Sequence, residues 1–548
     1  MVPKPVVSCP ADWRTDGLSA ALLGLIAFLV FCPVLGHRFL ESWDDSTAIL
    51  LNRDYNPPHL RHLVHYWTQP PESDLFYVPI TYSLWGLLAL VSRGSAPAGL
   101  PFNPAFFYAA NLLSHVMSSI LVYLILRRLV PSRPAAWIAA AFFALHPIQV
   151  EAIANAWTVY TPLSAMFGFF AVWQYLIFSE RKVHRNRASV PGWRRSPRIH
   201  YAAGTFGFAL ALLTKPTIVT IPLMVAAIEL GLRGRKVRDV ALPLGIWLAM
   251  AFVIFLVNHH ATAVAYIFVP EPLFRTMVPL DAIAFYLGKI LVPVHLVMDY
   301  GRTPYSIAGH SHLQFTCILA IALLGASWML RRRWPWILTG LGVFVFGLIP
   351  TIGILPFTFQ YFSTVADRYV YVAMLGPALV LAFWLTKFSM NLVLPAALAI
   401  LAILAGMSVA QLRHWQDDWQ VAAYTLKVNP RSNAAPAIFE YLFTRKFHRD
   451  PPEHPLPAPG LCSLGQSELL EIGDLMFGRH YYEVASRCYQ EALHKGPAKA
   501  DVYARLGRTL ERDCRPLEAK EACKQALAID PNEIDAKLTL GKIAKEIP

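Results

Sequence analysis

The sequence predicts an all-α protein in two parts: a polytopic membrane body of about 11 transmembrane helices, followed by a C-terminal α-solenoid. Three observations predict this fold class. The 548 residues are 55% hydrophobic and only 15% charged, with a mean hydropathy of +0.42, whereas soluble domains carry about 25% charge. Long apolar runs recur over the first three quarters of the chain. A repeat with a fixed period occupies the last part.

Charge divides the chain near residue 412. Residues 1–412 hold 29 Lys and Arg against 16 Asp and Glu, so the whole formal charge of +13 lies there. Residues 413–548 hold 19 of each. Charged residues make up 11% of the first part and 28% of the second. The charge distribution therefore indicates a membrane body joined to a neutral soluble tail. Because the tail is neutral and has no basic stripe, nucleic acid is not expected as a partner.

Four segments follow from these changes in composition. They are a membrane domain at 1–412, a half repeat with a connecting helix at 413–450, a proline-rich linker at 451–466, and the repeats at 467–548.

The N-terminal segment indicates a membrane anchor. Lys4 and Arg14 precede the apolar run 18–36, and no small-residue cleavage signal follows it. We therefore expect an uncleaved anchor with a cytoplasmic N-terminus. Arg (33) well exceeds Lys (15), which favours a bacterial source and its inner membrane. In a eukaryote the same body would lie in the endoplasmic reticulum membrane.

Eleven apolar runs are candidates for transmembrane helices, each compared with the roughly 20 residues that a span requires. They cover residues 18–36, 105–130, 135–146, 157–178, 201–214, 216–231, 239–258, 313–330, 335–355, 370–386 and 391–411. Two further runs, 77–92 and 278–297, are short or interrupted by proline, and we expect them to be interfacial or re-entrant.

Basic clusters orient these spans. If 77–92 and 278–297 do not cross, every basic cluster falls on the cytoplasmic side, as the positive-inside rule requires. The outer face, periplasmic or luminal, then holds the loops 37–104 and 259–312 and the whole C-terminal tail. A site that uses carboxylates is expected on this outer face.

The tail repeats with a period of 34 residues. Gly473, Gly507 and Gly541 align at this period, and small, bulky and proline positions around them coincide as well. This is the tetratricopeptide pattern, in which helix pairs stack into a concave groove that binds peptide. The alternative is a module that only packs or solubilises the protein.

The first candidate site is Trp43-Asp44-Asp45, directly after the first span in the large outside loop. Adjacent carboxylates can act as a general base, as metal ligands, or as both. The alternative is an acidic pair that faces solvent and caps a helix.

The second candidate is the segment 146–152, which places His146 and Glu151 at the outside end of two apolar helices. Ionisable groups at membrane depth are candidates for function, although the two side chains could also simply face water. Two basic residues complete the set, because Lys215 lies between two apolar runs and Arg368 lies in Ala366-Asp367-Arg368-Tyr369. Either cation could hold a phosphate, and the alternatives are a snorkelling lysine and an internal Asp–Arg pair.

In this order, the motifs resemble the transmembrane and tetratricopeptide-repeat O-mannosyltransferase family of the GT-C glycosyltransferases. The segments that carry the resemblance are Trp43-Asp44-Asp45, residues 77–82, 111–115 and 146–152, Thr214-Lys215-Pro216, residues 366–369 and Arg413-His414-Trp415. One departure is Val78, where the family usually has arginine.

The resemblance implies a GT-C membrane enzyme whose site lies on the luminal or periplasmic face. Its donor would be a polyprenyl- or dolichyl-phosphate sugar, most often mannose, and its acceptor a Ser or Thr hydroxyl of a protein bound by the repeat groove. The donor and the spans would also contact membrane lipids.

The implied site has three groups of residues. Asp44, Asp45 and Glu151 are the candidate catalytic carboxylates. Arg368, Lys215 and His146 are the candidate donor-phosphate ligands. Trp43, Tyr77 and Tyr82 are the candidate loop residues at the acceptor. Whether a divalent metal is required stays open, with Asp45 and Glu151 as its candidate ligands.

Two other functions remain open from the sequence. One is a lipid-linked glycan ligase or polymerase, whose acceptor would be a glycan or a lipid. The other is a non-catalytic membrane scaffold that displays the repeats, in which the carboxylates would be structural.

Overall fold

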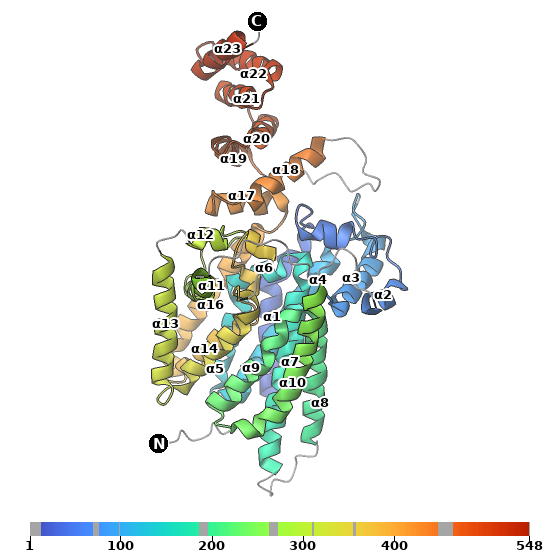
Figure 1. Ribbon diagram of the computed structural model, residues 1–548, viewed down its shortest axis with the longest axis vertical. Coiled ribbons are helices and arrows are strands. Elements are labelled where there is room, and N and C mark those ends of the chain that lie inside the picture. The colour runs from blue at the N-terminus through green and yellow to red at the C-terminus, as the bar shows by residue number, and fades with distance from the viewer. Residues whose placement is uncertain are drawn as a thin grey trace. The chain divides into compact units, whose positions relative to one another are not determined.

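Helices alone form the regular secondary structure of the residues that this computed structural model describes (Figure 1), namely 13–68, 76–97, 99–185, 196–261, 272–308, 312–354, 358–447 and 464–546. The chain divides into two units. One comprises the chain up to Leu40 and Asp44–Gln416, and the other comprises Glu41–Trp43 together with the chain from Asp417 onward. This division lies four residues after the boundary expected at 412 and 413.

The α-helices of the first unit are α1 (Trp13–Phe31), α2 (His62–Thr68), α3 (Pro79–Ser92), α4 (Pro104–Leu129), α5 (Arg133–Leu145), α6 (Val150–Ile153), α7 (Tyr160–Arg185), α8 (Pro197–Thr214), α9 (Ile221–Ala227), α10 (Val237–Ala261), α11 (Pro272–Leu291), α12 (Pro304–Ala308), α13 (Leu313–Leu330), α14 (Pro335–Leu348), α15 (Leu375–Leu385) and α16 (Met390–Arg413). Short 3-10 turns join several of them, among them Pro147–Gln149, Pro216–Thr220 and Asp367–Tyr369.

Six helices of the described residues are long and apolar enough to cross a membrane, and a bent pair, Arg133–Leu145 with Pro147–Ile153, brings the number to seven. The protein is therefore a multi-pass membrane protein. The shorter apolar helices include Pro216–Leu232, Pro335–Thr351 and Leu375–Leu385. Each of the eleven expected runs overlaps a helix of the described residues, but a count of eleven spans stays a prediction because several of these helices are short. Neither α3 nor α11 is among the candidate spans.

Proline and a preceding cap residue set where several helices begin. Asn103 accepts a hydrogen bond from the Ala105 N–H at 3.0 Å, with Pro104 as the first residue of α4. Ser132 and Ser196 cap α5 and α8 in the same way. A side-chain oxygen at the cap satisfies an N–H that the helix leaves free, and proline tolerates the first turn.

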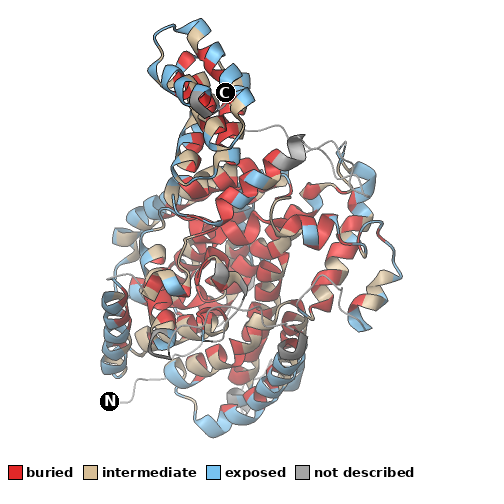
Figure 2. Cartoon of the chain, turned by 45° about the horizontal axis from the view of Figure 1, so that its top comes forward, coloured by how far each residue is buried: buried red, intermediate tan, exposed pale blue. Residues whose placement is uncertain are grey.

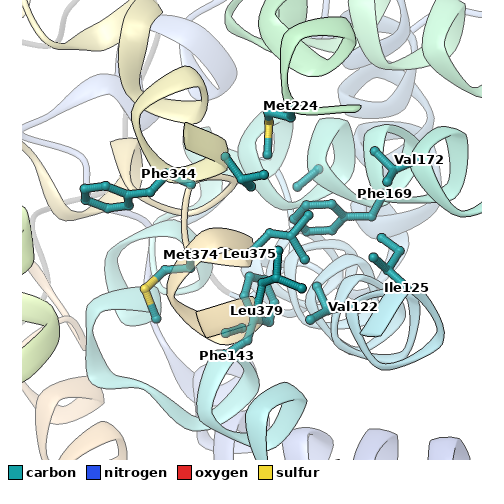
Figure 3. Close-up of a cluster of buried hydrophobic side chains, with 14 of the residues drawn as sticks. Val122, Ile125, Phe143, Phe169, Val172, Met224, Phe344, Met374, Leu375 and Leu379 are labelled. Atoms are coloured by element: carbon teal, nitrogen blue, oxygen red, sulfur yellow. The ribbon is translucent and has the colours of Figure 1, made fainter. Parts of the chain in front are cut away.

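The core of the first unit lies where α4, α5, α7, α9, α14 and α15 meet (Figure 3). The side chains drawn there are apolar, with Phe143 of α5 and Phe169 of α7 in edge-to-face contact at 5.7 Å. Glycine allows close helix contact here, because a Cβ at Gly347 of α14 would lie 2.7 Å from the Ala373 Cα. Small residues that bring helix backbones together are typical of membrane bundles.

The outer helices of this unit are exposed along much of their length (Figure 2), and many of their exposed side chains are apolar. On α13, Phe315, Ile318 and Met329 are 66%, 65% and 81% exposed. On α16, Leu392 is 77% exposed. Apolar surface of this extent on one side of long helices marks a surface that contacts lipid.

The second unit contains α17 (Asp418–Val428), α18 (Ala434–Phe447), α19 (Gln466–Gly478), α20 (Tyr482–Lys495), α21 (Ala500–Arg512), α22 (Pro516–Ile529) and α23 (Ile534–Glu546). The bounds of α19, α21 and α23 differ by 34 residues, as do those of α20 and α22. The helices thus follow the sequence period, and their identity as tetratricopeptide repeats stays a prediction. Most of the linker expected at 451–466 lies outside the described residues.

Candidate active site

An ion pair between Glu151 and Arg368 lies at the centre of the candidate site. The Arg368 Nη1 donates to Glu151 Oε1, and the Arg368 backbone N–H donates to Glu151 Oε2 at 3.0 Å. Both side chains are buried. The guanidinium also lies over the rings of Phe359 and Tyr369, 4.3 and 4.9 Å from their centroids. A buried pair with this many partners fixes the guanidinium in one place.

Two features of the sequence bring this pair together. Glu151 lies on α6, a single turn that follows the bend at Pro147. Arg368 lies in the 3-10 turn Asp367–Tyr369, which precedes α15. Burial alone would lower the pKa of the Arg368 guanidinium, but the Glu151 carboxylate raises it, so this arginine stays charged.

Lys215 joins the same cluster. It ends α8 before Pro216, its Nζ donates to the Thr161 Oγ1 at 2.7 Å, and it lies 4.6 Å above the Tyr160 ring. Burial, together with the positive charge of Arg368, lowers the pKa of Lys215 to about 7, and the Glu151 carboxylate acts in the opposite direction. Lys215 therefore titrates near neutral pH.

Asp44 is the second carboxylate of the cluster. It is partly buried, and burial raises the pKa of its carboxyl group, while the nearby charge of Arg368 lowers it. The charge of Asp44 in turn raises the pKa of Arg368. A carboxylate with a raised pKa near the Arg368 guanidinium is suited to accept a proton.

Asp45 lies beside Asp44 but is held differently. Its Oδ2 accepts from the Leu40 N–H and its Oδ1 from the Trp157 N–H, both at 2.8 Å, and the residue is fully buried. Asp45 thereby ties the loop after the first span to the turn before α7. The adjacent carboxylates of the sequence motif thus differ in surroundings, with Asp45 acting on backbone groups and Asp44 facing the charged cluster.

His146 is engaged by backbone groups on both ring nitrogens. Its Nδ1 accepts from the Ile148 N–H at 3.2 Å, and its Nε2 lies 3.1 Å from the Ile290 carbonyl. It therefore caps the turn Pro147–Gln149 and joins it to α11. Its role as a phosphate ligand stays a prediction.

The loop residues Tyr77 and Tyr82 hold the first outside loop. The Tyr77 N–H donates to the Asn258 Oδ1 at 2.9 Å, and its hydroxyl donates to the Trp67 carbonyl at 2.9 Å. Tyr82 is buried and donates to the Phe76 carbonyl. The third loop residue, Trp43, falls in Glu41–Trp43, where the Glu41 and Ser42 N–H groups donate to Asp418 of the second unit at 2.9 and 3.1 Å.

The cluster also contains two tyrosines, Tyr160 and Tyr369, which were not among the candidates selected from the sequence. Tyr160, at the start of α7, lies beneath the Lys215 ammonium, and the Arg368 Nη2 lies 3.5 Å from the Tyr369 hydroxyl. Tyr369 lies in segment 366–369, directly after Arg368, so the sequence alone could have indicated that it belongs to the site. Nothing in the sequence distinguishes Tyr160 as a site residue, because aromatic residues are common at the ends of apolar runs, where a helix meets the membrane interface.

The two candidate metal ligands, Asp45 and Glu151, already accept hydrogen bonds on both of their oxygens. Both oxygens of Asp45 already accept from backbone N–H groups, and both oxygens of Glu151 accept from Arg368. Among the described residues, no group of three or more His, Cys, Asp and Glu side chains is arranged to hold a metal.

A second charged network lies at the other end of the same bundle. Asp16 bonds Arg127 and Arg133, each at 2.9 Å, while Glu180 bonds Arg128 at 2.7 Å and Arg233 at 2.5 Å. On α7, Thr161 contacts the cluster at Lys215 and Glu180 contacts this network. These residues are 19 positions apart, which corresponds to about 28 Å of helix, close to the thickness of a bilayer core.

Comparisons with known proteins agree with the family resemblance. The Drosophila melanogaster protein O-mannosyl-transferase Tmtc2 is 28% identical over 329 residues, which cover 55% of this chain and 33% of the fly protein. The fly protein O-mannosyl-transferase Tmtc1 is 30% identical over 136 residues, covering 24% of this chain and 15% of its own length. The chain therefore spans a third or less of these relatives. No family model matches, and no solved structure matches. The similarity to these two proteins confirms the resemblance drawn from the motifs.

Proposed function

We propose that this protein is a membrane glycosyltransferase of the GT-C type that moves a sugar from a polyprenyl- or dolichyl-phosphate donor to a Ser or Thr hydroxyl of a protein. The observation that carries the proposal is the cluster in which Asp44 and Glu151 meet Lys215 and Arg368. These residues come from four separate segments of the chain. The names of the two relatives favour mannose as the sugar.

Asp44 is the proposed general base. Its carboxylate takes the proton from the acceptor hydroxyl as the hydroxyl oxygen attacks the anomeric carbon of the sugar. The bond between that carbon and the phosphate oxygen breaks on the opposite face, so the configuration inverts. The raised pKa of Asp44 supports this role, because a base whose pKa lies closer to neutral pH takes up a proton more readily.

Arg368 and Lys215 are the proposed ligands of the departing phosphate. The electron pair of the broken bond remains on the phosphate oxygen, and the two cations offset the charge that develops there. A phosphate monoester is a good leaving group, so the step needs no general acid. Glu151 is the proposed positioning residue, since it holds Arg368 by both the side chain and the backbone.

We place this site on the periplasmic or luminal face, with eleven spans and a cytoplasmic N-terminus. The basic network of Arg127, Arg128 and Arg233 supports this orientation, because cytoplasmic ends carry an excess of Arg and Lys. The 34-residue helical repeats would bind the acceptor protein.

Sugar transfer by the full chain in lipid nanodiscs tests the proposal. The donor is a polyprenyl-phosphate mannose, and the acceptor is a Ser/Thr-rich peptide. Arg368→Gln should lower kcat by about 10²–10³, as expected when a charge-stabilising donor is removed. Arg302→Gln is the matched control, because Arg302 pairs with Asp281 and is not one of the four charged residues proposed to act on the donor and acceptor.

Unchanged transfer by Arg368→Gln would contradict the phosphate assignment. Transfer to a lipid-linked glycan in place of the peptide would instead identify a glycan ligase or polymerase. No transfer to any acceptor by the wild type, in a preparation that binds the donor normally, would favour a membrane scaffold.

A further inference from the structure

Two neighbouring turns of the membrane unit carry four cations. The turn between α13 and α14 holds three consecutive arginines, 331–333, and the turn after α15 holds Lys387. Aromatic rings connect the two turns, because the ring centroid of Trp336 lies 6.5 Å from that of Trp334 and 6.4 Å from that of Phe383. We call Arg331, Arg332, Arg333 and Lys387 the basic turn cluster.

The basic turn cluster lies at the level of the charged network around Glu180. Figure 1 shows the turn between α13 and α14 at the lower end of the bundle. Thr339, in the second turn of α14, lies against Gly231, where a Cβ would overlap the Thr339 hydroxyl. Gly231 comes two residues before Arg233, which pairs with Glu180. The cluster therefore lies at one membrane interface, at the end of the bundle away from the candidate active site.

The arginines of that network have carboxylate partners, whereas the basic turn cluster has none among the described residues. Arg128 and Arg233 both pair with Glu180, at 2.7 and 2.5 Å. Between residues 300 and 416 the only acidic residue is Asp367, which lies in the 3-10 turn before α15, at the other end of that helix. The four positive charges therefore suit an anion from outside the chain.

Tryptophan rings hold two of the arginines in place. The Arg331 guanidinium lies 4.1 Å from the centroid of the Trp328 ring, and its Nη1 donates to the Trp328 carbonyl at 2.7 Å. The Arg333 guanidinium lies 5.1 Å from the centroid of the Trp334 ring. A ring supports the flat face of a guanidinium and leaves the N–H donors along its edge accessible. Such an edge matches the oxygens of a phosphate.

The side chains beside the cations are those of a lipid-facing surface. Trp328 and Met329, which directly precede the arginines, are 58% and 81% exposed. Trp384 and Phe388 of the second turn are also exposed and pack edge to face at 4.9 Å. Exposed apolar residues at the end of a transmembrane helix face acyl chains, and exposed tryptophans lie at the level of the headgroups. The cations next to them therefore lie where lipid phosphates are.

We propose that the basic turn cluster binds the phosphate of an anionic phospholipid, whose acyl chains lie along the exposed face of α13. This proposal is independent of the proposed transferase activity. An anionic headgroup is favoured over a zwitterionic one, because a choline group would bring a further positive charge to four cations. A lipid is favoured over a soluble acidic partner, because the arginines directly follow side chains that face the acyl chains.

Binding of phosphatidylglycerol to the detergent-solubilised full chain tests the proposal. The protein is titrated into a fluorescent phosphatidylglycerol, which unlabelled phosphatidylglycerol should displace and the same concentration of phosphatidylcholine should not. Arg331→Gln and Arg333→Gln should each raise the dissociation constant about fivefold, as expected for the loss of one cation near a lipid headgroup, and the double variant should raise it about twentyfold or more. Thermal unfolding should be unchanged, because neither change breaks an ion pair of the described residues.

Arg238→Gln is the matched control. Arg238 lies at the same end of the bundle, is 78% exposed, and lies 4.0 Å from Asp239 and outside the basic turn cluster. The substitution removes the same charge from the protein, so it should change the dissociation constant by less than about twofold. This comparison separates binding at the cluster from a general effect of net charge.

Three results would overturn the proposal. Equal displacement by phosphatidylglycerol and phosphatidylcholine would show that the acyl chains bind without recognition of the headgroup. Equal displacement by inorganic phosphate or by a soluble acidic peptide would identify an anion site that does not select lipid. An Arg331→Gln and Arg333→Gln double variant that binds as tightly as Arg238→Gln would place the lipid on another surface.

Discussion

At the scale of single residues, two adjacent carboxylates have different surroundings. Asp45 is fully buried and both of its oxygens accept backbone N–H groups, from Leu40 and Trp157. Asp44 is partly buried, and its pKa responds to burial and to Arg368. Asp45 is therefore a structural residue whose hydrogen bonds fix the loop that carries Asp44, the proposed base.

Substitution of Asp44 should affect the rate of sugar transfer, whereas substitution of Asp45 should affect the stability of the fold. Asp44→Asn should lower the rate of sugar transfer by about 10²–10⁴, the contribution typical of a general base, without changing thermal stability. Asp45→Asn should destabilise the protein by about 1–3 kcal/mol, since an amide offers one acceptor oxygen to two N–H donors. Turnover and thermal unfolding measured on the same nanodisc samples separate the two effects. Full turnover by a stably folded Asp44→Asn variant would reject Asp44 as the base.

Lys215 predicts a pH dependence of transfer. Its pKa of about 7 means that the ammonium loses its proton as the pH rises through neutrality, so kcat/KM for the phosphate donor should fall above about pH 7. Arginine stays charged throughout this range, so Lys215→Arg should lose the alkaline decline. An identical decline in Lys215→Arg would assign it to another group.

The lowered pKa of Lys215 also makes the folding stability depend on pH. The pKa of Lys215 is lower in the folded protein than in the unfolded chain, so between about pH 7 and 10 the unfolded chain binds more protons at this position. The contribution of Lys215 to folding stability therefore increases with pH over the range in which transfer declines.

At the scale of elements, proline, cap residues and glycine account for the course of the chain. Pro147 and Pro216 each follow a functional candidate, His146 and Lys215. A residue before proline is disfavoured in a helix, so α5 and α8 end at these two residues. In the second unit, a glycine at the same position of each repeat allows the two helices of a pair to pack closely where they cross.

The repeat glycines should differ in their tolerance of alanine. Gly473→Ala should destabilise the second unit by about 1–3 kcal/mol, because its Cβ meets the buried ring of Tyr489. Gly541→Ala should leave stability unchanged or raise it by up to about 1 kcal/mol, since alanine favours the helix and no atom of the described residues lies within 4 Å of the added Cβ. Thermal unfolding of the full chain measures both variants, and equal destabilisation by the two would contradict this difference.

At the scale of the whole membrane unit, two charged layers lie at the two ends of the bundle. The cluster of Asp44, Glu151, Lys215 and Arg368 lies near the start of α7, and the network around Glu180 lies near its end. The helices between them present apolar side chains on their outer surface. This arrangement is that of a bundle which spans a bilayer with one charged layer at each interface.

Labelling of single cysteines should find the two layers on opposite sides of the membrane. Thr47→Cys, at an exposed position next to Asp44, should react with a membrane-impermeant maleimide from the periplasmic or luminal side. Arg238→Cys, at a side chain that is 78% exposed, should react only from the cytoplasmic side. A background without the exposed Cys514 serves as the control. Reaction of both positions from the same side would refute the proposed orientation.

The sequence by itself determined the helical class, the membrane character, the 34-residue period of the second unit and the candidate residues. These follow from local pattern, since hydropathy, cap residues and repeat period act over neighbouring positions. The sequence also placed Asp44, Glu151, Lys215 and Arg368 among the residues to examine, because ionisable groups are unusual in an apolar chain.

Only the tertiary structure decided which of these residues lie together. Glu151 and Arg368 are 217 positions apart in the chain, and their contact depends on how the turn at Pro147 packs against the turn before α15. The difference between Asp44 and Asp45 depends on N–H groups supplied by Leu40 and Trp157, which no local pattern encodes. The close contacts at Gly473 and Gly507 likewise depend on which helix packs there.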